Sequence, residues 1–331
     1  MRKILIINRL GIGDVVLTTP LAQGIKELYT ARVGMVVAPK APDVVTNHPY
    51  IDDVFPYRLP SKREMIDRIR EKGYEEALIV DGRFSSTMLA IKAGCKPIHP
   101  GFEISIGPRR LFTGKRRAES AIVDYTAFLA YLDASKPVPD LPARVGDADE
   151  ASRKKVADWF AVHQAMAGRL ILVIPKGLSE NKNWEQAYFS EVTGFLNQKG
   201  YIPVYLGAKH DWEYIEGIAG EKVNCAGTFT LRELPLLACK ALVCISVCTG
   251  PMHVVATTGV PIIALYGPTA PKRWAPRSAQ VLQSQRACVP CEKLTCDQSV
   301  FRACMQEILP ERVVQAIDRI LAAGPQEKYE K

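Results

Sequence analysis

Asp14 is a carboxylate at the end of a glycine-bearing turn, residues 8–14, that joins a predicted strand to a predicted helix. In that position it can act as a general base that takes a proton from a substrate hydroxyl. The structural alternative, in which Asp14 caps the helix by accepting backbone N–H bonds, is the commoner use of an aspartate at a helix start. Val16 stands where a dinucleotide fingerprint needs its third glycine, which argues against NAD as a ligand.

Two later turns carry groups that can bind a diphosphate. Lys182 lies in a loop after a predicted strand, where an ammonium can neutralise charge on a departing phosphate, although a solvated lysine is the default for any single Lys. Thr249 and Gly250 lie at a predicted helix start, and His253 follows one turn further in. A structural histidine is the simpler alternative for His253, but three donors after one strand favour a phosphate site.

Four of the nine cysteines are clustered with the spacing C-x2-C-x4-C-x7-C. Such a set can wrap a tetrahedral zinc or a single iron and stabilise a loop that lacks a core of its own. An iron–sulfur cluster uses the same ligands, but no partner redox motif accompanies them. Unliganded thiols are the alternative, and disulfides apply in an oxidising compartment. The four residues are Cys288, Cys291, Cys296 and Cys304.

A run of basic residues lies in a predicted long loop of the first half. Most such runs are solvated surface. In a protein that holds a nucleotide elsewhere, this run can instead bind an anionic acceptor. Nucleic acid is not favoured, because neither a platform of aromatic residues nor a nucleic-acid fold signature accompanies the run. The residues concerned are Arg109, Arg110, Lys115, Arg116 and Arg117.

Length and composition exclude several classes of protein. The chain has 331 residues, 43 Lys and Arg against 35 Asp and Glu, and 47% hydrophobic residues, which excludes a disordered or collagen-like chain. The net charge of +8 favours an anionic partner. The apolar runs are too short to span a membrane, and the amino-terminal run lacks a cleavage site, so we expect a cytoplasmic protein with reduced cysteines.

Short strand-like runs alternate with helical periodicity along the whole chain, which predicts an α/β protein with two doubly wound, Rossmann-like domains. A segment with three prolines, residues 136–144, marks the crossing from the first domain to the second. We place the domains at 1–165 and 166–331. The predicted strands are 3–7, 31–37, 52–55 and 76–80 in the first half, then 170–174, 202–206, 222–225, 241–246 and 261–265; 312–321 is the last predicted helix.

Taken together, the motifs resemble the family 9 glycosyltransferases, which include the ADP-heptose:lipopolysaccharide heptosyltransferases. The resemblance rests on residues 9–20, 47–56, 182–184, 248–253 and 265–269, which occur in the family's order and spacing. It implies a GT-B fold, with two Rossmann-like domains facing a central cleft. The first domain would bind the acceptor and the second the nucleotide sugar, with a final helix packing back on the first domain.

The same resemblance implies roles for individual residues. Asp14 matches the family's base and Lys182 its phosphate-binding lysine. Cys248 departs from the usual Asp of the diphosphate loop, which leaves the donor sugar open because a thiol is a poor acceptor for sugar hydroxyls. The implied donor-binding residues are Gly13, Lys182, Cys248, Thr249, Gly250 and His253, with Asp211 or Glu213 at the ribose.

The implied reaction is inverting transfer of heptose from ADP-heptose to a phosphorylated inner-core acceptor of lipopolysaccharide, without a catalytic metal. It would take place at the cytoplasmic face of the inner membrane, with the protein bound peripherally. The four-cysteine segment resembles one that holds iron in heptosyltransferases that modify proteins, so a structural zinc or iron is expected. The alternatives are a related transferase with another nucleotide sugar or a protein acceptor, and a non-catalytic nucleotide-binding or metal- or redox-sensing module.

Overall fold

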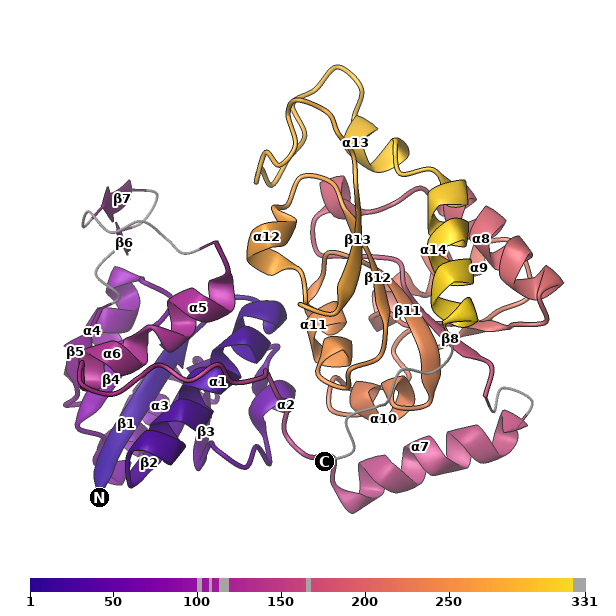
Figure 1. The fold of residues 1–331 in the computed structure, drawn as a ribbon. Coiled ribbons are helices and arrows are strands. Elements are labelled where there is room, and N and C mark those ends of the chain that lie inside the picture. The colour runs from indigo at the N-terminus through magenta and orange to yellow at the C-terminus, as the bar shows by residue number, and fades with distance from the viewer. Residues whose placement is uncertain (100–102, 107–108, 113–118, 165–167, 324–331) are drawn as a thin grey trace. The chain divides into compact units, whose positions relative to one another are not determined.

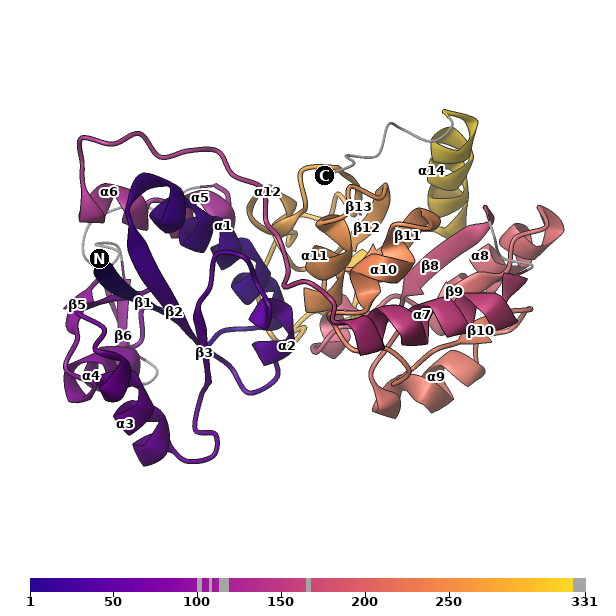
Figure 2. The same cartoon turned by 90° about the horizontal axis from the view of Figure 1, so that it is seen from below.

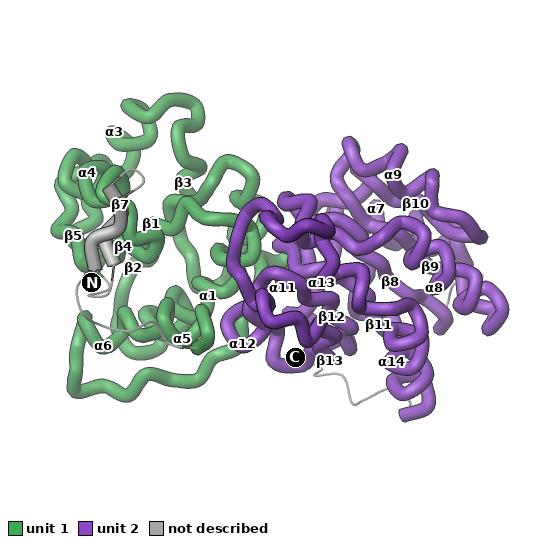
Figure 3. The backbone as a smooth tube through the Cα atoms, turned by 90° about the horizontal axis from the view of Figure 1, so that it is seen from above, with its two compact units in different colours: residues 1–147 green, residues 148–331 purple. Residues whose placement is uncertain are grey.

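The computed structural model describes residues 1–99, 103–106, 109–112, 119–164 and 168–323. It divides into two compact units, residues 1–147 and 148–331 (Figure 3). Each unit contains a parallel sheet with helices on both faces (Figures 1 and 2). The predicted pair of doubly wound α/β domains is therefore confirmed.

The sheet of the first unit has the strand order β3-β2-β1-β4-β5. The middle of its central strand is apolar, because a strand covered by helices on both faces has no solvent side; Ile4, Leu5, Ile6 and Ile7 are all fully buried. The strands are β1 (Arg2–Asn8), β2 (Ala31–Val37), β3 (Asp53–Pro56), β4 (Glu76–Ile79) and β5 (Lys96–Ile98).

Helices cover both faces of this sheet. One face packs against α3 (Lys62–Lys72) and α4 (Phe84–Lys92), whose buried residues join the strands in one core. The other carries α1 (Ile12–Leu28), which packs against α5 (Ala121–Thr126) and α6 (Phe128–Leu132) (Figure 2). A short helix, α2 (Pro42–Val45), precedes β3.

The second unit contains a sheet with the order β10-β9-β8-β11-β12-β13. Its core is formed on one face by α8 (Gln186–Gln198), α9 (Trp212–Glu216) and α14 (Pro310–Ala322). The strands are β8 (Leu170–Ile174), β9 (Pro203–Tyr205), β10 (Val223–Asn224), β11 (Ala241–Val247), β12 (Ile262–Tyr266) and β13 (Ala279–Gln283); the remaining helices include α10 (Leu234–Ala238), α11 (Gly250–Ala256), α12 (Pro271–Trp274) and α13 (Ala303–Gln306).

The boundary between the units lies earlier than the predicted residue 165, because α7 (Glu150–Val162) belongs to the second unit. Lys155 of this helix pairs with the buried Glu233 at 2.7 Å, and Trp159 packs edge-to-face on Phe229. The packing of the last helix, α14, on the first domain stays a prediction. Its apolar face, Val313 to Ile317, is buried in the core of the second unit.

None of the helices among the described residues is long and apolar enough to cross a membrane.

Candidate functional site

The turns that carry Asp14, Lys182 and Thr249 lie where the strand order of their own sheet reverses. Ligands of doubly wound sheets bind at such points, beyond the carboxyl ends of the strands. In the first sheet the order reverses between β1 and β4, and Asp14 lies in the turn after β1. In the second sheet it reverses between β8 and β11, and these strands are followed by the Lys182 loop and by the turn 248–253.

Asp14 is the third residue of α1, so it does not occupy the cap position itself, which is Gly11. Its Oδ2 accepts a bond from the Gly11 amide at 3.2 Å, and its Oδ1 accepts one from the Tyr125 hydroxyl at 2.6 Å. Asp14 thus accepts a backbone N–H bond at the helix start, which is the structural role named as the alternative. Its half-buried position at the strand end is equally compatible with a base.

A buried ion pair accompanies Asp14 at this sheet edge. Arg9 Nε bonds Asp81 Oδ2 at 3.0 Å, and both side chains are almost completely buried. Ser86 donates a further bond to the same carboxylate oxygen at 2.7 Å, and Arg9 Nη2 donates to Ser85. The sequence analysis missed Asp81, although it directly follows a predicted strand and thus had the same signal as Asp14.

The two turns of the second sheet lie against each other. A Cβ added at Gly177, in the loop after β8, would lie 3.4 Å from the Cys248 carbonyl oxygen and 3.6 Å from Thr249 Cβ. These are ordinary contact distances, so the loop of Lys182 and the turn of Thr249 and Gly250 lie side by side. The predicted phosphate-binding residues of this unit come together as expected from their strand ends.

The Lys182 loop is fixed by its buried neighbours. Lys182 ends a short 3-10 helix, Glu180–Lys182, between the buried side chains of Asn181 and Asn183. Asn183 Oδ1 accepts a bond from the Gly177 amide at 2.8 Å, which closes the loop. Trp184 is buried, and its indole donates to the Ile308 carbonyl at 2.7 Å.

The charge of Lys182 affects the pKa values of two residues in the neighbouring turn. Burial and, to a smaller extent, the nearby Lys182 lower the pKa of His253 to about 4, so the imidazole is neutral at pH 7. Burial raises the pKa of the Cys248 thiol, and Lys182 opposes that shift. At neutral pH the turn therefore presents an uncharged thiol and an uncharged imidazole beside one ammonium.

Asp211 and Glu213 differ in their surroundings. Asp211 is buried; its Oδ2 accepts a bond from the Ala208 amide at 2.9 Å, and its Oδ1 lies 3.5 Å from Lys176 Nζ. Glu213 is exposed on α9. Asp211 thus stabilises the turn after β9, whereas Glu213 faces solvent.

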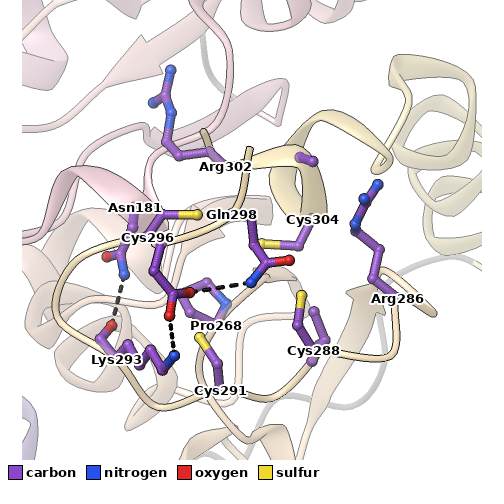
Figure 4. Close-up of a pocket in the computed structure, with 13 residues that line it drawn as sticks. Asn181, Pro268, Arg286, Cys288, Cys291, Lys293, Cys296, Gln298, Arg302 and Cys304 are labelled. Carbon is purple, nitrogen blue, oxygen red and sulfur yellow. Dashed lines mark hydrogen bonds and ion pairs between the residues drawn. The ribbon is translucent and has the colours of Figure 1, made fainter. Parts of the chain in front are cut away.

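The four clustered cysteines all line one small cavity, together with Asn181 and Arg302 (Figure 4). Burial raises the pKa of Cys304, and the other three thiols raise it further. All four are free thiols. Within the described part of the chain, however, there is no group of three or more His, Cys, Asp or Glu side chains arranged to hold a metal ion. The metal centre therefore stays a prediction.

The predicted basic loop is partly a strand. Arg109 and Arg110 lie on β7 (Arg109–Phe112), which pairs antiparallel with β6 (Glu103–Ile106). Alternation of polar and apolar residues over 103–106 is the signal that could have identified the first strand of this pair. Lys115, Arg116 and Arg117 lie outside the described residues.

Comparison with known proteins identifies one family. The family model for glycosyltransferase family 9 (heptosyltransferase) matches residues 62–300. The lipopolysaccharide heptosyltransferase 2 of Salmonella typhimurium is 24% identical over 349 residues, covering 97% of this chain and 99% of that protein.

Solved structures share the fold. The Escherichia coli ADP-heptose lipopolysaccharide heptosyltransferase II superposes with a TM-score of 0.76 at 20% identity, covering 97% of this chain and 99% of that one. The iron-containing dodecameric glycosyltransferase TibC of enterotoxigenic E. coli superposes with a TM-score of 0.65 at 13% identity, covering 97% and 76%. These likenesses confirm the predicted GT-B class of fold.

Proposed function

The chain belongs to glycosyltransferase family 9 and is a glycosyltransferase, and from this premise we propose that it transfers heptose from ADP-heptose to the inner core of lipopolysaccharide. The observation that carries the proposal is that the turn of Asp14, and the turns of Lys182 and Thr249, lie at the reversal points of their own sheets. Relatives that match nearly the whole chain are named lipopolysaccharide heptosyltransferases, which supports the donor and the acceptor class. Membership of a glycosyltransferase family argues against the non-catalytic alternative.

In the proposed mechanism, Asp14 takes the proton of the attacking acceptor hydroxyl. The acceptor oxygen forms a bond to the anomeric carbon as the bond from that carbon to the diphosphate oxygen breaks, and ADP leaves with the electron pair. Lys182, the amides of Thr249 and Gly250, and neutral His253 stabilise the charge that grows on ADP. Gly13 would line the donor site, and Asp211 or Glu213 would bind the ribose, with exposed Glu213 the more accessible of the two.

The donor sugar is tested by a binding panel. Cys248 is an uncharged thiol in a position where a carboxylate would accept bonds from sugar hydroxyls. Isothermal titration with ADP-heptose, a UDP-sugar and a GDP-sugar separates the proposed donor from a related one. We expect tight binding of ADP-heptose alone, and preference for another nucleotide sugar would favour the related transferase.

The base is tested by one isosteric change. Asp14→Asn keeps the shape but cannot take a proton, so transfer should fall by at least about 10³-fold while ADP affinity stays within about twofold. The assay measures the release of ADP in the presence of a core acceptor. A variant that retains most of its activity would remove Asp14 as the base.

A phosphorylated acceptor suits a protein with a net charge of +8. We propose that Arg109, Arg110, Lys115, Arg116 and Arg117 bind acceptor phosphates or the anionic surface of the inner membrane, at which the protein would act peripherally from the cytoplasm. A protein acceptor is the alternative. Co-sedimentation with vesicles containing anionic lipid, at low and at high salt, tests the membrane part of this proposal.

We also propose a structural zinc or iron on Cys288, Cys291, Cys296 and Cys304. Thiolates are the ligands that both metals use in tetrahedral sites, and here four thiols line one cavity. Ligation would draw them together and stabilise the segment. Elemental analysis of protein prepared without chelator should find about one metal per chain, and Cys288→Ser with Cys291→Ser should abolish it. Metal-free wild-type protein would leave the four residues as free thiols.

A further inference from the structure

The carboxylate of Asp14 is tied to a helix far along the chain. Tyr125 Oη donates a hydrogen bond of 2.6 Å to Asp14 Oδ1, across 111 residues of sequence. Tyr125 lies on α5, which packs against α1, and only 5% of its surface is exposed. The pair thus belongs to the packed interior of the first unit.

From this geometry we infer that Tyr125 is a positioning residue that holds the Asp14 carboxylate in the orientation needed for proton abstraction. The inference rests on the proposed function, in which Asp14 is the base. Nothing in the family motifs assigns a role to Tyr125, since none of the motif segments includes it.

The backbone of Asp14 is fixed independently of its carboxylate. The Asp14 carbonyl accepts bonds from Thr18 Oγ1 at 2.7 Å and from Asn8 Nδ2 at 3.3 Å. Asn8 and Thr18 are fully buried and bond each other at 2.7 Å. With the main chain held in this way, rotation about the side-chain bonds is the motion left to Asp14. The Tyr125 hydroxyl and the Gly11 amide restrict that rotation, one at each oxygen.

The chemistry of the partner suits a base. A carboxylate can accept about four hydrogen bonds, and these two use one site on each oxygen. A neutral hydroxyl orients the group and favours its ionised form, whereas a cation in the same place would lower its basicity further. Arg9 after β1 and Asp81 after β4 form an ion pair with each other.

The test is Tyr125→Phe, which removes one oxygen and keeps the packed ring. We expect kcat to fall about tenfold with a much smaller change in KM. The acid limb of the kcat–pH profile should move up by about one pH unit, because the ionised carboxylate loses a donor. A residue that only supports packing would leave this limb in place.

Tyr74→Phe is the matched control. Tyr74 is also buried in the first unit, and its hydroxyl donates to Asp53 at 2.5 Å, away from the sheet edge that carries Asp14. This variant loses the same kind of bond, so its melting temperature should fall while its pH profile stays that of the wild type. Melting curves of both variants verify that each is folded.

The double variant Asp14→Asn, Tyr125→Phe completes a double-mutant cycle, which measures whether the two side chains act together. If Tyr125 acts through Asp14, its removal should have almost no further effect once the base is gone. A Tyr125→Phe enzyme with wild-type kcat and pH profile, beside an inactive Asp14→Asn, would overturn this inference and leave the proposed function standing. An active Asp14→Asn would instead overturn the base assignment.

Discussion

Lys182 is half-buried and has its charge next to His253 and Cys248, so its contribution to ADP binding can be measured by one substitution. Lys182→Ala should weaken ADP affinity by about 10- to 100-fold, because a charge-assisted bond to phosphate is lost. Isothermal titration with ADP measures the change.

Lys199→Ala removes the same charge from the same unit at an exposed position, where Lys199 lies 3.7 Å from Asp318. ADP affinity should stay unchanged in this control. Equal losses in the two variants would mean that only the overall charge of the unit matters, and the phosphate role of Lys182 would then be wrong.

At the residue scale, the sequence was informative where a function depends on a local turn. Asp14 and Lys182 each follow a strand within a few residues, so strand-end reasoning could find them. Tyr125 could not be found in this way, because its contact with Asp14 depends on how α5 packs on α1. Asp81 had the strand-end signal of Asp14, but its ion pair depends on Arg9, 72 residues away.

At the scale of elements, the segment between β13 and α13 connects two loops of the second unit. Asn181 Nδ2 donates to the Lys293 carbonyl at 2.6 Å, and Ser179 Oγ donates to the Leu294 carbonyl at 2.8 Å. On its other side, Glu292 Oε1 accepts a bond from the Ala270 amide at 2.7 Å. The cysteine-bearing segment therefore supports the loop of Lys182 as well as the loop after β12.

Asn181→Ala tests this support, because it removes the donor to the Lys293 carbonyl. The unit should lose about 0.5–1.5 kcal/mol of stability, and ADP affinity should fall although Lys182 is intact. Asn197→Ala is the control, since Asn197 also bonds main-chain groups, those of Tyr201 and Glu221, but outside the loop. It should lower the melting temperature alone; a matching loss of ADP affinity in it would contradict the specific role of the segment.

The central elements were predictable and the peripheral ones were not. The apolar runs of β2 and β8 define their strands to the residue, because buried parallel strands are continuous in hydrophobicity. The edge strand β13, Ala279–Gln283, is mostly half-buried, which leaves little apolar pattern to detect. Strand β5 is three residues long and contains a proline, and it too was not predicted.

At the scale of the molecule, each unit contains one buried histidine whose titration opposes folding in acid. Burial lowers the pKa of His48 in the first unit, and that of His253 in the second, to about 4. The unfolded chain binds these protons near pH 6.5, so acid favours unfolding between about pH 6.5 and 4. Each unit should lose about 2 kcal/mol on going from pH 7 to pH 5.

Thermal or urea unfolding at pH 7 and pH 5 measures this loss. His48→Asn and His253→Gln should each reduce the pH dependence of the unit that carries the change, because neither amide titrates in this range. His210→Gln serves as the control, since that imidazole is 81% exposed. A pH dependence that persists in both buried-site variants would show that other groups cause it.

The two-domain organisation could be predicted from the alternation of strands and helices, but the boundary could not be placed to the residue. Helix α7 is mostly exposed and has a polar sequence, so its pattern does not say which core it joins. Only contacts such as Lys155 with Glu233 assign it to the second unit.

Among the described residues, each of the two main sheets is formed by strands from one half of the chain. Strands β1 to β5 fall within residues 2–98, and β8 to β13 fall within residues 170–283. A ribosome therefore delivers every strand of the first sheet before it begins the second. The amino-terminal half can close its core while the remainder is still being translated, and domains that emerge in this order commonly fold one after the other.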